Sequence, residues 1–340
     1  MALLNILHES ILQKRLFPPP AAAHNAPRSI ARKGEPHHET PHRHAGHSAG
    51  IAAAGFPFIA AAKTAPFDFE KRTVRLNDGH DMPIIGLGVF TLDDAATESA
   101  CIVALQNGCR LIDTAHVYSN EEAVGRGVKK SGVPRAQVCI TTKLWTSDFG
   151  RAAPEIDNML KRLDTDYIDL LLLHHPADRD EDAYSAMEQA VKAGKVRSIG
   201  LSNYYEKEFE RIMKGASITP AVVQNETHPY NQWRELKKFF DRHGTVLESW
   251  YPLGGRDRYG RSGFAMLAAD PVIVDLAKKH GKSTAQIILR WHLQDGNIAI
   301  PRSSNPAHIK ENLDIFNFQL DAGDMQRMAS LDKQQRFSTF

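Results

Sequence analysis

Residues 168–174, IDLLLLH, form an apolar run that closes on a histidine, and two comparable runs precede it, RLIDTA at 110–115 and VCITTKL at 138–144. These runs contain, or are soon followed by, side chains that hold or exchange a proton: Asp113, Tyr118, Lys143 and His174. Apolar strands that alternate with helical patterns predict a parallel sheet, in which ligands bind beyond the carboxyl ends of the strands. We therefore expect these four side chains to face one site.

Apolar runs of this kind recur along the chain, which gives eight candidate strands. They lie near Ile85, Leu111, Val138, Ile168, Val196, Ala221, Val246 and Ile298. The segments between them have helical spacing and capping residues: Asp93 or Asp94 before 95–106, Asn120 before 121–130 and Ser283 before 284–293. Eight strand-then-helix units predict an α/β fold, a closed (β/α)8 TIM barrel. An open doubly wound sheet is disfavoured, because no G-x-G-x-x-G fingerprint follows the first strand.

The segment before the first strand has a different pattern. Residues 71–86 alternate between polar and apolar positions, and Asn77-Asp78-Gly79 is a turn signal. Alternation interrupted by such a turn predicts a β-hairpin. We expect this hairpin to cap one end of the barrel.

Composition excludes several classes of protein. The 340 residues carry a net charge of only +2, so a basic patch for nucleic acid is not supported. The cysteines Cys101, Cys109 and Cys139 lack CxxC spacing, which argues against a zinc site and a disulfide framework. The stretch 52–62 is far shorter than the ~20 apolar residues of a membrane span. These features predict no metal, no membrane and no nucleic-acid partner, and a cytoplasmic location.

The first 67 residues differ from the rest of the chain. They hold seven of the sixteen histidines, a run of three prolines at 18–20 and an alanine-rich stretch. No packed domain is indicated, so we divide the chain into an extension, 1–67, and a barrel, 68–340. The extension is interpreted as a disordered tail. An organellar targeting peptide, a translation start assigned too far upstream and a histidine metal cluster stay open as alternatives.

The four proton-bearing side chains suit the chemistry of a carbonyl group. A phenol gives its proton to a carbonyl oxygen, and a nearby cation such as Lys143 lowers the cost of the phenolate that remains. Asp113 can hold Lys143 as an ammonium ion through an ion pair, and His174 can hydrogen-bond the same oxygen. Singly, each residue has an ordinary structural explanation. Their placement on three consecutive strands favours the functional interpretation.

These residues also lie in motifs that resemble those of the aldo-keto reductases. The motifs are Leu87-Gly88, Asp113-Thr114-Ala115-x-x-Tyr118, Thr142-Lys143-Leu144-Trp145, Leu172-Leu173-His174-x-Pro176, Gly194-Lys195-Val196-Arg197-x-Ile199-Gly200-x-Ser202-Asn203 and Ile300-Pro301-Arg302-Ser303. They run in order from about Val74 to Asp332 and leave out the extension. Within the family the chain is most similar to the short-looped prokaryotic-type branch that includes diketogluconate and methylglyoxal reductases. The resemblance implies NAD(P)H-dependent reduction of aldehydes or ketones, with Tyr118 as proton donor in a tetrad with Asp113, Lys143 and His174.

The resemblance also implies a set of cofactor residues. Ser202, Asn203 and Gln224 match the groups that hold the nicotinamide carboxamide, and Trp250 matches the aromatic residue stacked on the ring. Leu253 begins a loop over the pyrophosphate. The adenosine end matches Arg302, Ser303, His308, Glu311 and Asn312. NADPH is the expected cofactor and NADH remains possible, because Arg302 and His308 stand where the family often has Lys and Arg.

The substrate pocket is expected to be mostly apolar. Phe90 and Trp145 would form its walls, and His175 follows the tetrad histidine where many relatives have Trp. Such a pocket predicts a promiscuous reductase of small aldehydes and diketones. Separately, we expect the protein to act as a monomer. Two other classes stay open: an NADP(H)-binding regulatory or redox-sensing barrel without turnover, and a metal-dependent hydrolase or isomerase on the same fold.

Overall fold

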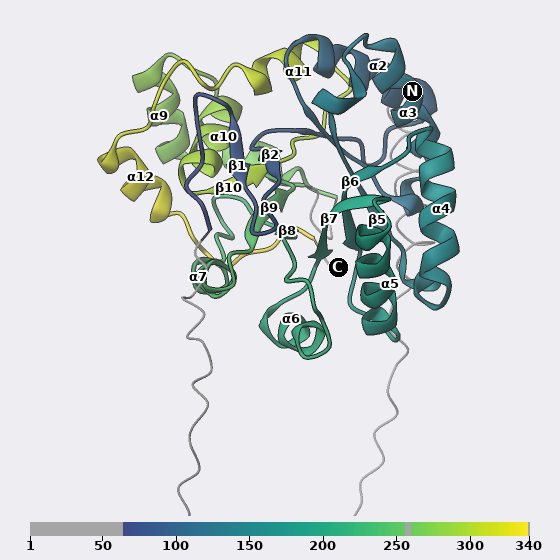
Figure 1. Cartoon of the computed structure of the whole chain (residues 1–340). Helices are drawn as coiled ribbons and strands as arrows, with labels where there is room; N and C mark the ends of the chain where they lie inside the picture. Colours follow the sequence, from purple (N-terminus) through teal and green to yellow (C-terminus); the bar gives the residue numbers. More distant parts are fainter. Residues whose placement is uncertain (1–63, 256–259, 339–340) are drawn as a thin grey trace, which may run out of the picture. The chain divides into compact units, whose positions relative to one another are not determined.

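The computed structural model describes residues 64–255 and 260–338 (Figure 1). Most of the predicted extension, residues 1–63, therefore lies outside the described residues. The boundary at residue 67 remains a prediction, as do the alternatives for the extension. The described residues fold as an α/β barrel.

Eight parallel strands form the sheet, and each pairs with the next one along the chain. They are β3 (Leu87–Gly88), β4 (Leu111–Asp113), β5 (Cys139–Leu144), β6 (Ile168–Leu173), β7 (Val196–Ser202), β8 (Val222–Glu226), β9 (Val246–Trp250) and β10 (Asn297–Ala299). All eight predicted strands are present near their predicted positions. The predicted fold class is confirmed.

The first and last strands close the barrel through backbone hydrogen bonds. Gly86 N donates to Ala299 O at 2.9 Å, and Ala299 N donates to Ile84 O at 3.1 Å. One step further along the seam, Gly88 N donates to Pro301 O at 3.1 Å. This seam leaves no open edge between β3 and β10, so the carboxyl ends of all eight strands surround one opening.

The predicted hairpin is present and packs against the amino ends of the barrel strands. It consists of β1 (Thr73–Arg75) and β2 (Asp81–Pro83), paired antiparallel, with Gly79 at φ +89 in the turn. Val74 and Met82 are each 1% exposed and pack in one cluster with residues from the starts of the barrel strands, such as Leu170. The hairpin thus closes the end of the barrel opposite to the predicted site.

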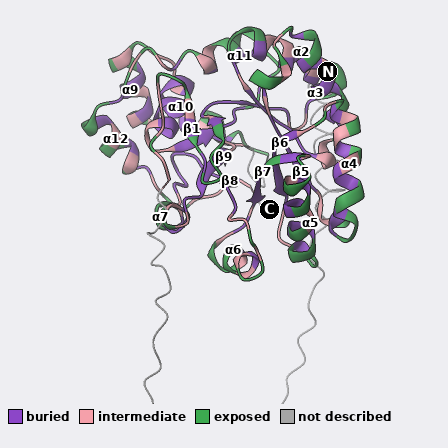
Figure 2. Cartoon of the chain, in the orientation of Figure 1, coloured by how far each residue is buried: buried purple, intermediate pink, exposed green. Residues whose placement is uncertain are grey.

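Helices surround the sheet, and the buried residues concentrate between them and the strands (Figures 1 and 2). They are α2 (Asp94–Gln106), α3 (Glu121–Lys130), α4 (Ala152–Leu163), α5 (Asp180–Lys192), α6 (Glu206–Met213), α7 (Arg234–Arg242), α8 (Gly263–Ala268), α9 (Pro271–His280), α10 (Thr284–Gln294), α11 (Pro306–Leu313) and α12 (Ala322–Ala329). Short 3-10 turns include η1 (His116–Tyr118), η2 (Arg135–Gln137) and η3 (Thr146–Arg151).

Two of the predicted helix caps are confirmed, and the third residue has a different function. Asp93 accepts from Ala96 N at the start of α2, and Ser283 forms a capping box with Gln286 at the start of α10.

Asn120 precedes α3 as expected, but its side chain makes no capping bond. It accepts from the Thr114 hydroxyl at 2.6 Å and donates to Val89 O at 3.0 Å. Asn120 therefore ties together the loops that follow β3 and β4, at the rim of the predicted site.

Candidate active site

Lys143 and Asp113 form a buried ion pair at the carboxyl ends of β5 and β4. Lys143 Nζ donates to the two carboxyl oxygens of Asp113 at 2.7 and 2.8 Å and to Thr114 O at 2.8 Å. An ammonium group has three hydrogens, and these three acceptors use all of them. The lysine side chain is only 1% exposed and that of the aspartate 4%. The ion pair expected from the sequence is present.

Tyr118 lies in η1, directly after β4, and its ring faces the lysine. Lys143 Nζ is 5.1 Å from the centroid of the phenol ring. Burial, followed by the charges of Asp113 and Glu248, raises the pKa of Tyr118 well above its ordinary value. We had expected Lys143 to lower this pKa. Burial and the nearby carboxyl groups outweigh the effect of Lys143 on the pKa of Tyr118, because the hydrogens of Lys143 are directed at Asp113 and Thr114. The phenol therefore holds its proton at neutral pH.

His174 follows β6 and lies against the same phenol. The two ring centroids are 5.6 Å apart in an edge-on arrangement. Burial, together with the charges of Lys143 and His175, lowers the pKa of His174 well below its ordinary value, so the imidazole is neutral. Its buried Nδ1 atom has no hydrogen-bond partner among the described residues. A protonated phenol and a neutral imidazole thus share one opening.

Aromatic rings surround this pair of groups. The rings of Phe90 and Tyr118 are 4.8 Å apart, and those of Trp145 and His174 are 5.1 Å apart. His175 stacks on His174 at 5.1 Å with an interplanar angle of 12°. Burial, followed by the charges of Arg336 and Lys143, lowers the pKa of His175 to about 4. The three residues predicted to line the substrate pocket therefore lie beside the tetrad.

Asn203 connects the ends of three strands. Its backbone is left-handed, with φ +63. Its amide nitrogen donates to His174 O at 3.0 Å and to the Ser202 hydroxyl at 3.1 Å, and its oxygen accepts from Trp250 Nε1 at 3.2 Å. The structure thus brings Ser202, Asn203 and Trp250 together next to His174.

Gln224 reaches the tetrad from β8. Its amide nitrogen donates to Asp113 Oδ2 at 2.8 Å and to Glu248 Oε2 at 2.7 Å. Within the described residues no donor is recorded for the Gln224 oxygen, and the Ser202 hydroxyl keeps its own hydrogen to donate. A carboxamide needs one acceptor and one donor of this kind. The side chains of Ser202 and Gln224 therefore fit the nicotinamide end of the cofactor.

The residues matched to the adenosine end lie on a neighbouring loop and helix. Arg302 is exposed and donates to the Thr91 hydroxyl at 3.2 Å. Ser303 is 7% exposed, and His308 is exposed on the first turns of α11. Glu311 and Asn312 lie in the last turn of the same helix. A guanidinium, a hydroxyl and a helix amino end in one place fit a phosphate group.

Two inward-facing glutamates were not among the residues predicted from the sequence. Glu226 ends β8 and Glu248 lies in β9, with side chains 0% exposed. The signal was available, because side chains of one strand alternate between its two faces. Glu226 comes two residues after Gln224, and Glu248 two residues before Trp250. Both glutamates therefore face the same interior as the predicted cofactor residues.

Glu226 anchors the C-terminal segment across this end of the barrel. Its carboxyl group accepts from Phe337 N at 2.5 Å, Ser338 N at 3.1 Å and Arg336 Nε at 3.0 Å. The Phe337 side chain is 1% exposed and packs against the ring of His228 at 4.5 Å. The residues from Asp332 to Ser338 are thus held in place and bring the positive charge of Arg336 near His175.

The loop after β9 contains Leu253, which was matched to the pyrophosphate. Leu253 is partly buried and packs at the edge of two core clusters. Gly254 follows with φ +76, and an added Cβ would come within 2.8 Å of the Gly263 backbone. The continuation of the loop, residues 256–259, lies outside the described residues. Leu253 lies three residues after the end of β9, and its contact with the pyrophosphate stays a prediction.

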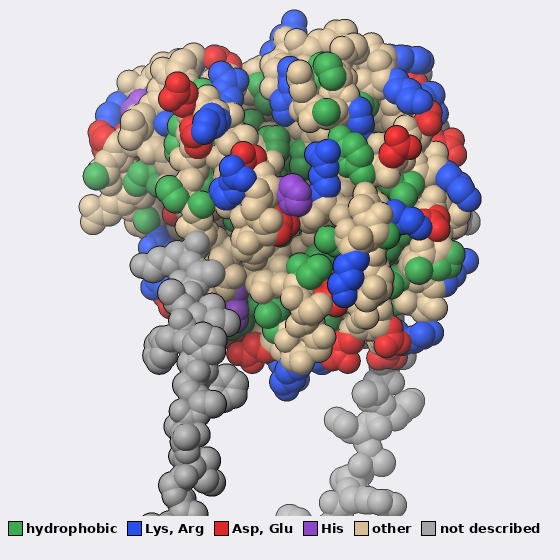
Figure 3. Space-filling view, in the orientation of Figure 1, with side chains coloured by type: hydrophobic (Ala, Val, Ile, Leu, Met, Phe, Trp, Pro, Cys, Tyr) green, Lys and Arg blue, Asp and Glu red, His purple; other side chains and the backbone are tan. Residues whose placement is uncertain are grey.

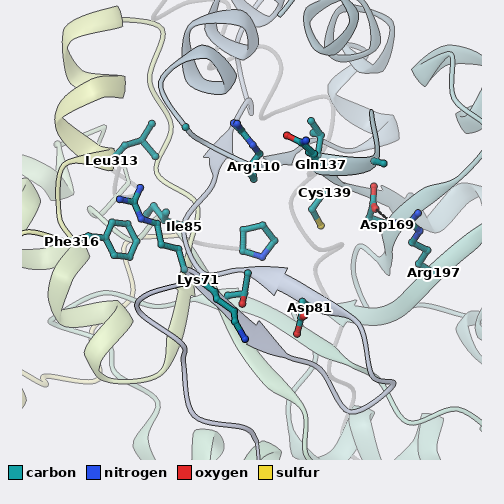
Figure 4. A pocket seen from close by; sticks show the side chains of 16 residues that line it. Lys71, Asp81, Ile85, Arg110, Gln137, Cys139, Asp169, Arg197, Leu313 and Phe316 are labelled. Atoms are coloured by element: carbon teal, nitrogen blue, oxygen red, sulfur yellow. Dashed lines mark hydrogen bonds and ion pairs between the residues drawn. The ribbon is translucent and has the colours of Figure 1, made fainter. Parts of the chain in front are cut away.

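A separate cavity of about 280 Å³ lies at the opposite, amino end of the barrel (Figure 4). Four basic side chains line it, and each contacts other parts of the protein. Arg197 forms an ion pair with Asp169, and Arg110 donates to one carbonyl group in the last turn of α2 and to one that follows the helix. Arg72 lies 4.4 Å over the ring of Phe316, and Lys71 is 3.6 Å from Asp68. These cations hold the hairpin and the helix ends in place.

Metal-binding clusters and membrane-spanning helices are both absent from residues 64–255 and 260–338. No group of three or more His, Cys, Asp or Glu side chains there has the arrangement of a metal site. No helix in this part of the chain is both long enough and apolar enough to cross a bilayer. On the face drawn in Figure 3, basic and acidic side chains are interspersed.

An eight-stranded barrel with this group of residues at its carboxyl ends is the arrangement of a barrel oxidoreductase. The chain belongs to the aldo/keto reductase family, whose model matches residues 85–333. It is 42% identical to glyoxal reductase of Bacillus subtilis (strain 168) over 271 residues, which cover 78% of this chain and 95% of that protein. It is 41% identical to morphine 6-dehydrogenase of Pseudomonas putida over 269 residues, covering 76% and 90%.

Solved structures show the same likeness. An aldo/keto reductase from Brucella melitensis has a TM-score of 0.72 and 43% identity, with coverage of 76% of this chain and 97% of that one. An aldo-keto reductase from a Medee basin deep-sea metagenome library has a TM-score of 0.75 and 36% identity, with coverage of 78% and 97%. The chain is therefore an oxidoreductase of this family, which uses nicotinamide cofactors.

Proposed function

We propose that this protein reduces aldehydes and ketones to alcohols with NADPH, and that Tyr118 donates the proton. The observation that carries the proposal is the pairing of a phenol that holds its proton with a neutral imidazole, beside the Lys143–Asp113 ion pair. A reductase needs an acid at the carbonyl oxygen, and a buried protonated phenol meets this need. The names of the relatives, a glyoxal reductase and a morphine dehydrogenase, support carbonyl and alcohol chemistry.

Each side chain of the tetrad has a distinct task in this proposal. The nicotinamide supplies the hydride when it is bound. Tyr118 gives its proton to the carbonyl oxygen, and His174 orients that oxygen with a hydrogen bond. Lys143 stabilises the phenolate that forms, because its ammonium group lies 5.1 Å from the centroid of the phenol ring. Asp113 keeps Lys143 charged and fixed in position through the two hydrogen bonds described above.

The cofactor is proposed to be held at both of its ends. Ser202, Asn203 and Gln224 would bind the carboxamide, and Trp250 would stack on the nicotinamide ring. Arg302 and Ser303 would bind the 2′-phosphate that distinguishes NADPH from NADH. His308, Glu311 and Asn312 would contact the adenosine, and Leu253 the pyrophosphate. The imidazole of His308 lacks the two-pronged donor geometry of a guanidinium, so NADH is proposed as a second cofactor.

The substrate is proposed to be a small aldehyde or diketone. Phe90, Trp145 and His175 give the pocket apolar walls with one polar corner, which discriminates weakly among carbonyl compounds. The test is a panel of short aldehydes, aromatic aldehydes and keto sugars, run with both cofactors. A KM spread below roughly tenfold is expected, because an apolar wall contributes little specificity. Activity confined to one compound would contradict this proposal.

The first functional prediction concerns Tyr118. Tyr118→Phe removes the acid and leaves the ring in place, so turnover is expected to fall by several orders of magnitude while NADPH affinity is nearly unchanged. The measurement follows the loss of nicotinamide absorbance with an aromatic aldehyde, and the binding of NADPH by fluorescence. Wild-type turnover in this variant would overturn the assignment of Tyr118. NADPH binding without any turnover by the native protein would favour the regulatory or redox-sensing alternative.

Two further proposals concern the oligomeric state of the protein and its location in the cell. We propose that it acts as a monomer and in the cytoplasm, and its similarity to bacterial relatives agrees with this location. Light scattering of the full chain measures the first. Fractionation of cells that express the full chain, including residues 1–67, measures the second and separates it from organellar targeting.

A further inference from the structure

Glu226 and Glu248 offer a comparison of two glutamates buried on neighbouring strands. Glu226 accepts from Arg336, His228 and two backbone amides. Burial raises its pKa, but these partners outweigh burial and bring the pKa of Glu226 below its ordinary value. Glu226 is therefore an ionised carboxylate that is fully supplied with hydrogen-bond donors.

Glu248 accepts far fewer hydrogen bonds than Glu226. Its Oε2 atom accepts from Gln224 Nε2 at 2.7 Å, and its Oε1 atom is buried with no hydrogen-bond partner among the described residues. The same Gln224 nitrogen donates to Asp113 at 2.8 Å, so one amide group bridges two carboxyl groups. A buried carboxylate with so few donors is strongly disfavoured, whereas an uncharged carboxyl group tolerates one unpaired oxygen better.

The balance of charge leads to the same conclusion. Among the described residues that hydrogen-bond this cluster, Lys143 is the one cation, and it directs two hydrogens at Asp113. Asp113 thus receives three of the hydrogen bonds given by Lys143 and Gln224, and Glu248 receives one. Two carboxylates that share one amide repel each other, so one of them keeps its proton. The hydrogen bonds assign the charge to Asp113 and the proton to Glu248.

We propose that Glu248 is a positioning residue which holds a proton at neutral pH, and that this uncharged carboxyl group leaves Asp113 as the single negative partner of Lys143. Burial, followed by the charge of Asp113, raises the pKa of Glu248 to about 8. The titratable groups that face it are Asp113 from β4, Lys143 and Cys139 from β5, and Tyr118 from η1. Glu248 therefore becomes charged in mildly alkaline solution.

Ionisation of Glu248 changes the chemistry of the neighbouring phenol. A second negative charge inside the barrel makes the phenolate of Tyr118 harder to form, so the phenol becomes a poorer acid. It also competes with Asp113 for Gln224. Reduction is thus expected to slow as the pH rises through about 8. This effect on turnover rests on the proposed function, whereas the proton on Glu248 does not.

The proton is tested without any turnover, by infrared spectroscopy of the full chain from well below to well above pH 8. We expect the band of a protonated carboxyl group to disappear with a midpoint near pH 8, and to be missing in Glu248→Gln. Glu226→Gln is the matched control and is expected to keep the band, because Glu226 is already ionised. A wild-type protein without this band, or a Glu248→Gln protein that retains it, would overturn the proposal.

A labelled wild-type protein covers the case in which Glu248→Gln fails to fold. Glutamate that carries heavy carbon in its carboxyl group shifts the band if a glutamate holds the proton, and labelled aspartate does not. A shift with labelled aspartate alone would assign the proton to Asp113 and refute the proposal.

The effect on catalysis is measured as kcat against pH, with KM for NADPH measured separately. In the wild type we expect an alkaline decline in kcat centred near pH 8, and in Glu248→Gln a kcat that no longer declines there. A purely structural role would lower kcat equally at every pH, which would contradict the proposal. If the native protein shows the infrared titration but no carbonyl reduction, the proposed function fails and the proton on Glu248 stands.

Discussion

At the scale of single residues, the ion pair between Lys143 and Asp113 decides both charge and stability at the site. Both side chains are almost completely buried, and Lys143 donates two of its three hydrogens to Asp113. Removing one partner of such a pair leaves a charge that water cannot reach. Such an uncompensated charge is much more costly than the loss of an exposed pair.

The second prediction follows from this pair. Lys143→Met is expected to reduce the free energy of unfolding by about 3–5 kcal/mol near pH 8, because Asp113 is left buried and unpaired. The loss should be smaller at pH 5, where Asp113 takes up a proton more readily. Urea denaturation at both pH values measures it. Lys238→Met, which breaks the exposed pair with Glu235, is the control and should leave the midpoint unchanged. An equal loss at both pH values would contradict the assignment of the charge to Asp113.

The tetrad itself was predictable from single residues, whereas its hydrogen bonds were not. Asp113, Lys143 and His174 end consecutive parallel strands, so their convergence follows from chain order and strand direction alone. The sharing of Gln224 between two carboxyl groups depends on the register of β8 and β9, which the sequence does not specify. The direction of the pKa shift of Tyr118 was also missed, because it comes first from burial and then from the carboxyl groups of Asp113 and Glu248.

At the scale of elements, a close contact sets how α3 lies against α4. Gly125 lies within α3, and a Cβ atom added there would be 2.4 Å from Leu163 O, at the end of α4. Only a residue without a side chain allows this approach. The α3 helix follows directly after Tyr118 and Asn120, so its position contributes to the position of the proposed proton donor.

The third prediction tests this contact. Gly125→Ala would ordinarily stabilise a helix by about 0.5–1 kcal/mol. Here the clash with Leu163 is expected to reverse the sign and to reduce the free energy of unfolding by about 1–3 kcal/mol. Chemical denaturation measures the change. Gly215→Ala serves as the comparison, because nothing lies within 4 Å of an added Cβ at that position. A stabilised Gly125→Ala protein would show that the two helices can move apart freely.

Most elements could be predicted because each carries a local signal. The strands are short apolar runs, the hairpin has alternation around Asn77-Asp78-Gly79, and α10 has Ser283 and Gln286 three residues apart. Asn120 shows the limit of such signals. It has the residue type of a helix cap, but the bonds it makes are to Thr114 and to Val89 O, and the Val89 contact spans a separation of 31 residues. A bond to a distant loop cannot be inferred from neighbours in the chain.

At the scale of the whole molecule, pH is expected to control the C-terminal segment that Glu226 anchors. His228 beside it is buried, and burial lowers its pKa below 6.5, so it stays neutral in the folded protein. Glu226 has a lowered pKa, so it stays charged. Both groups bind protons more readily in the unfolded chain than in the folded one. Their contributions to stability are therefore complete at neutral pH and are lost on acidification.

The fourth prediction concerns this segment, residues 332–338. Its protection against hydrogen exchange, corrected for intrinsic rates, should fall as the pH decreases below 6.5 and further below 4.5, the ordinary pKa values of His and Glu. Mass spectrometry of the C-terminal peptide measures it. In Glu226→Gln the protection should be low at every pH. Constant protection of the native peptide between these pH values would show that Glu226 does not hold the segment.

The seam that closes the barrel has a consequence for synthesis on the ribosome. Seven of the eight strand pairings join neighbours along the chain and can form as the chain emerges. The seam joins β3 to β10, and Arg302 reaches back 212 residues to Phe90. Until β10 has left the ribosome, the nascent chain exposes two unpaired strand edges, and the Phe90 wall and Arg302 cannot meet. The pocket therefore forms only after β10 has been translated. Just before that point the exposed strand edges favour the binding of chaperones most strongly.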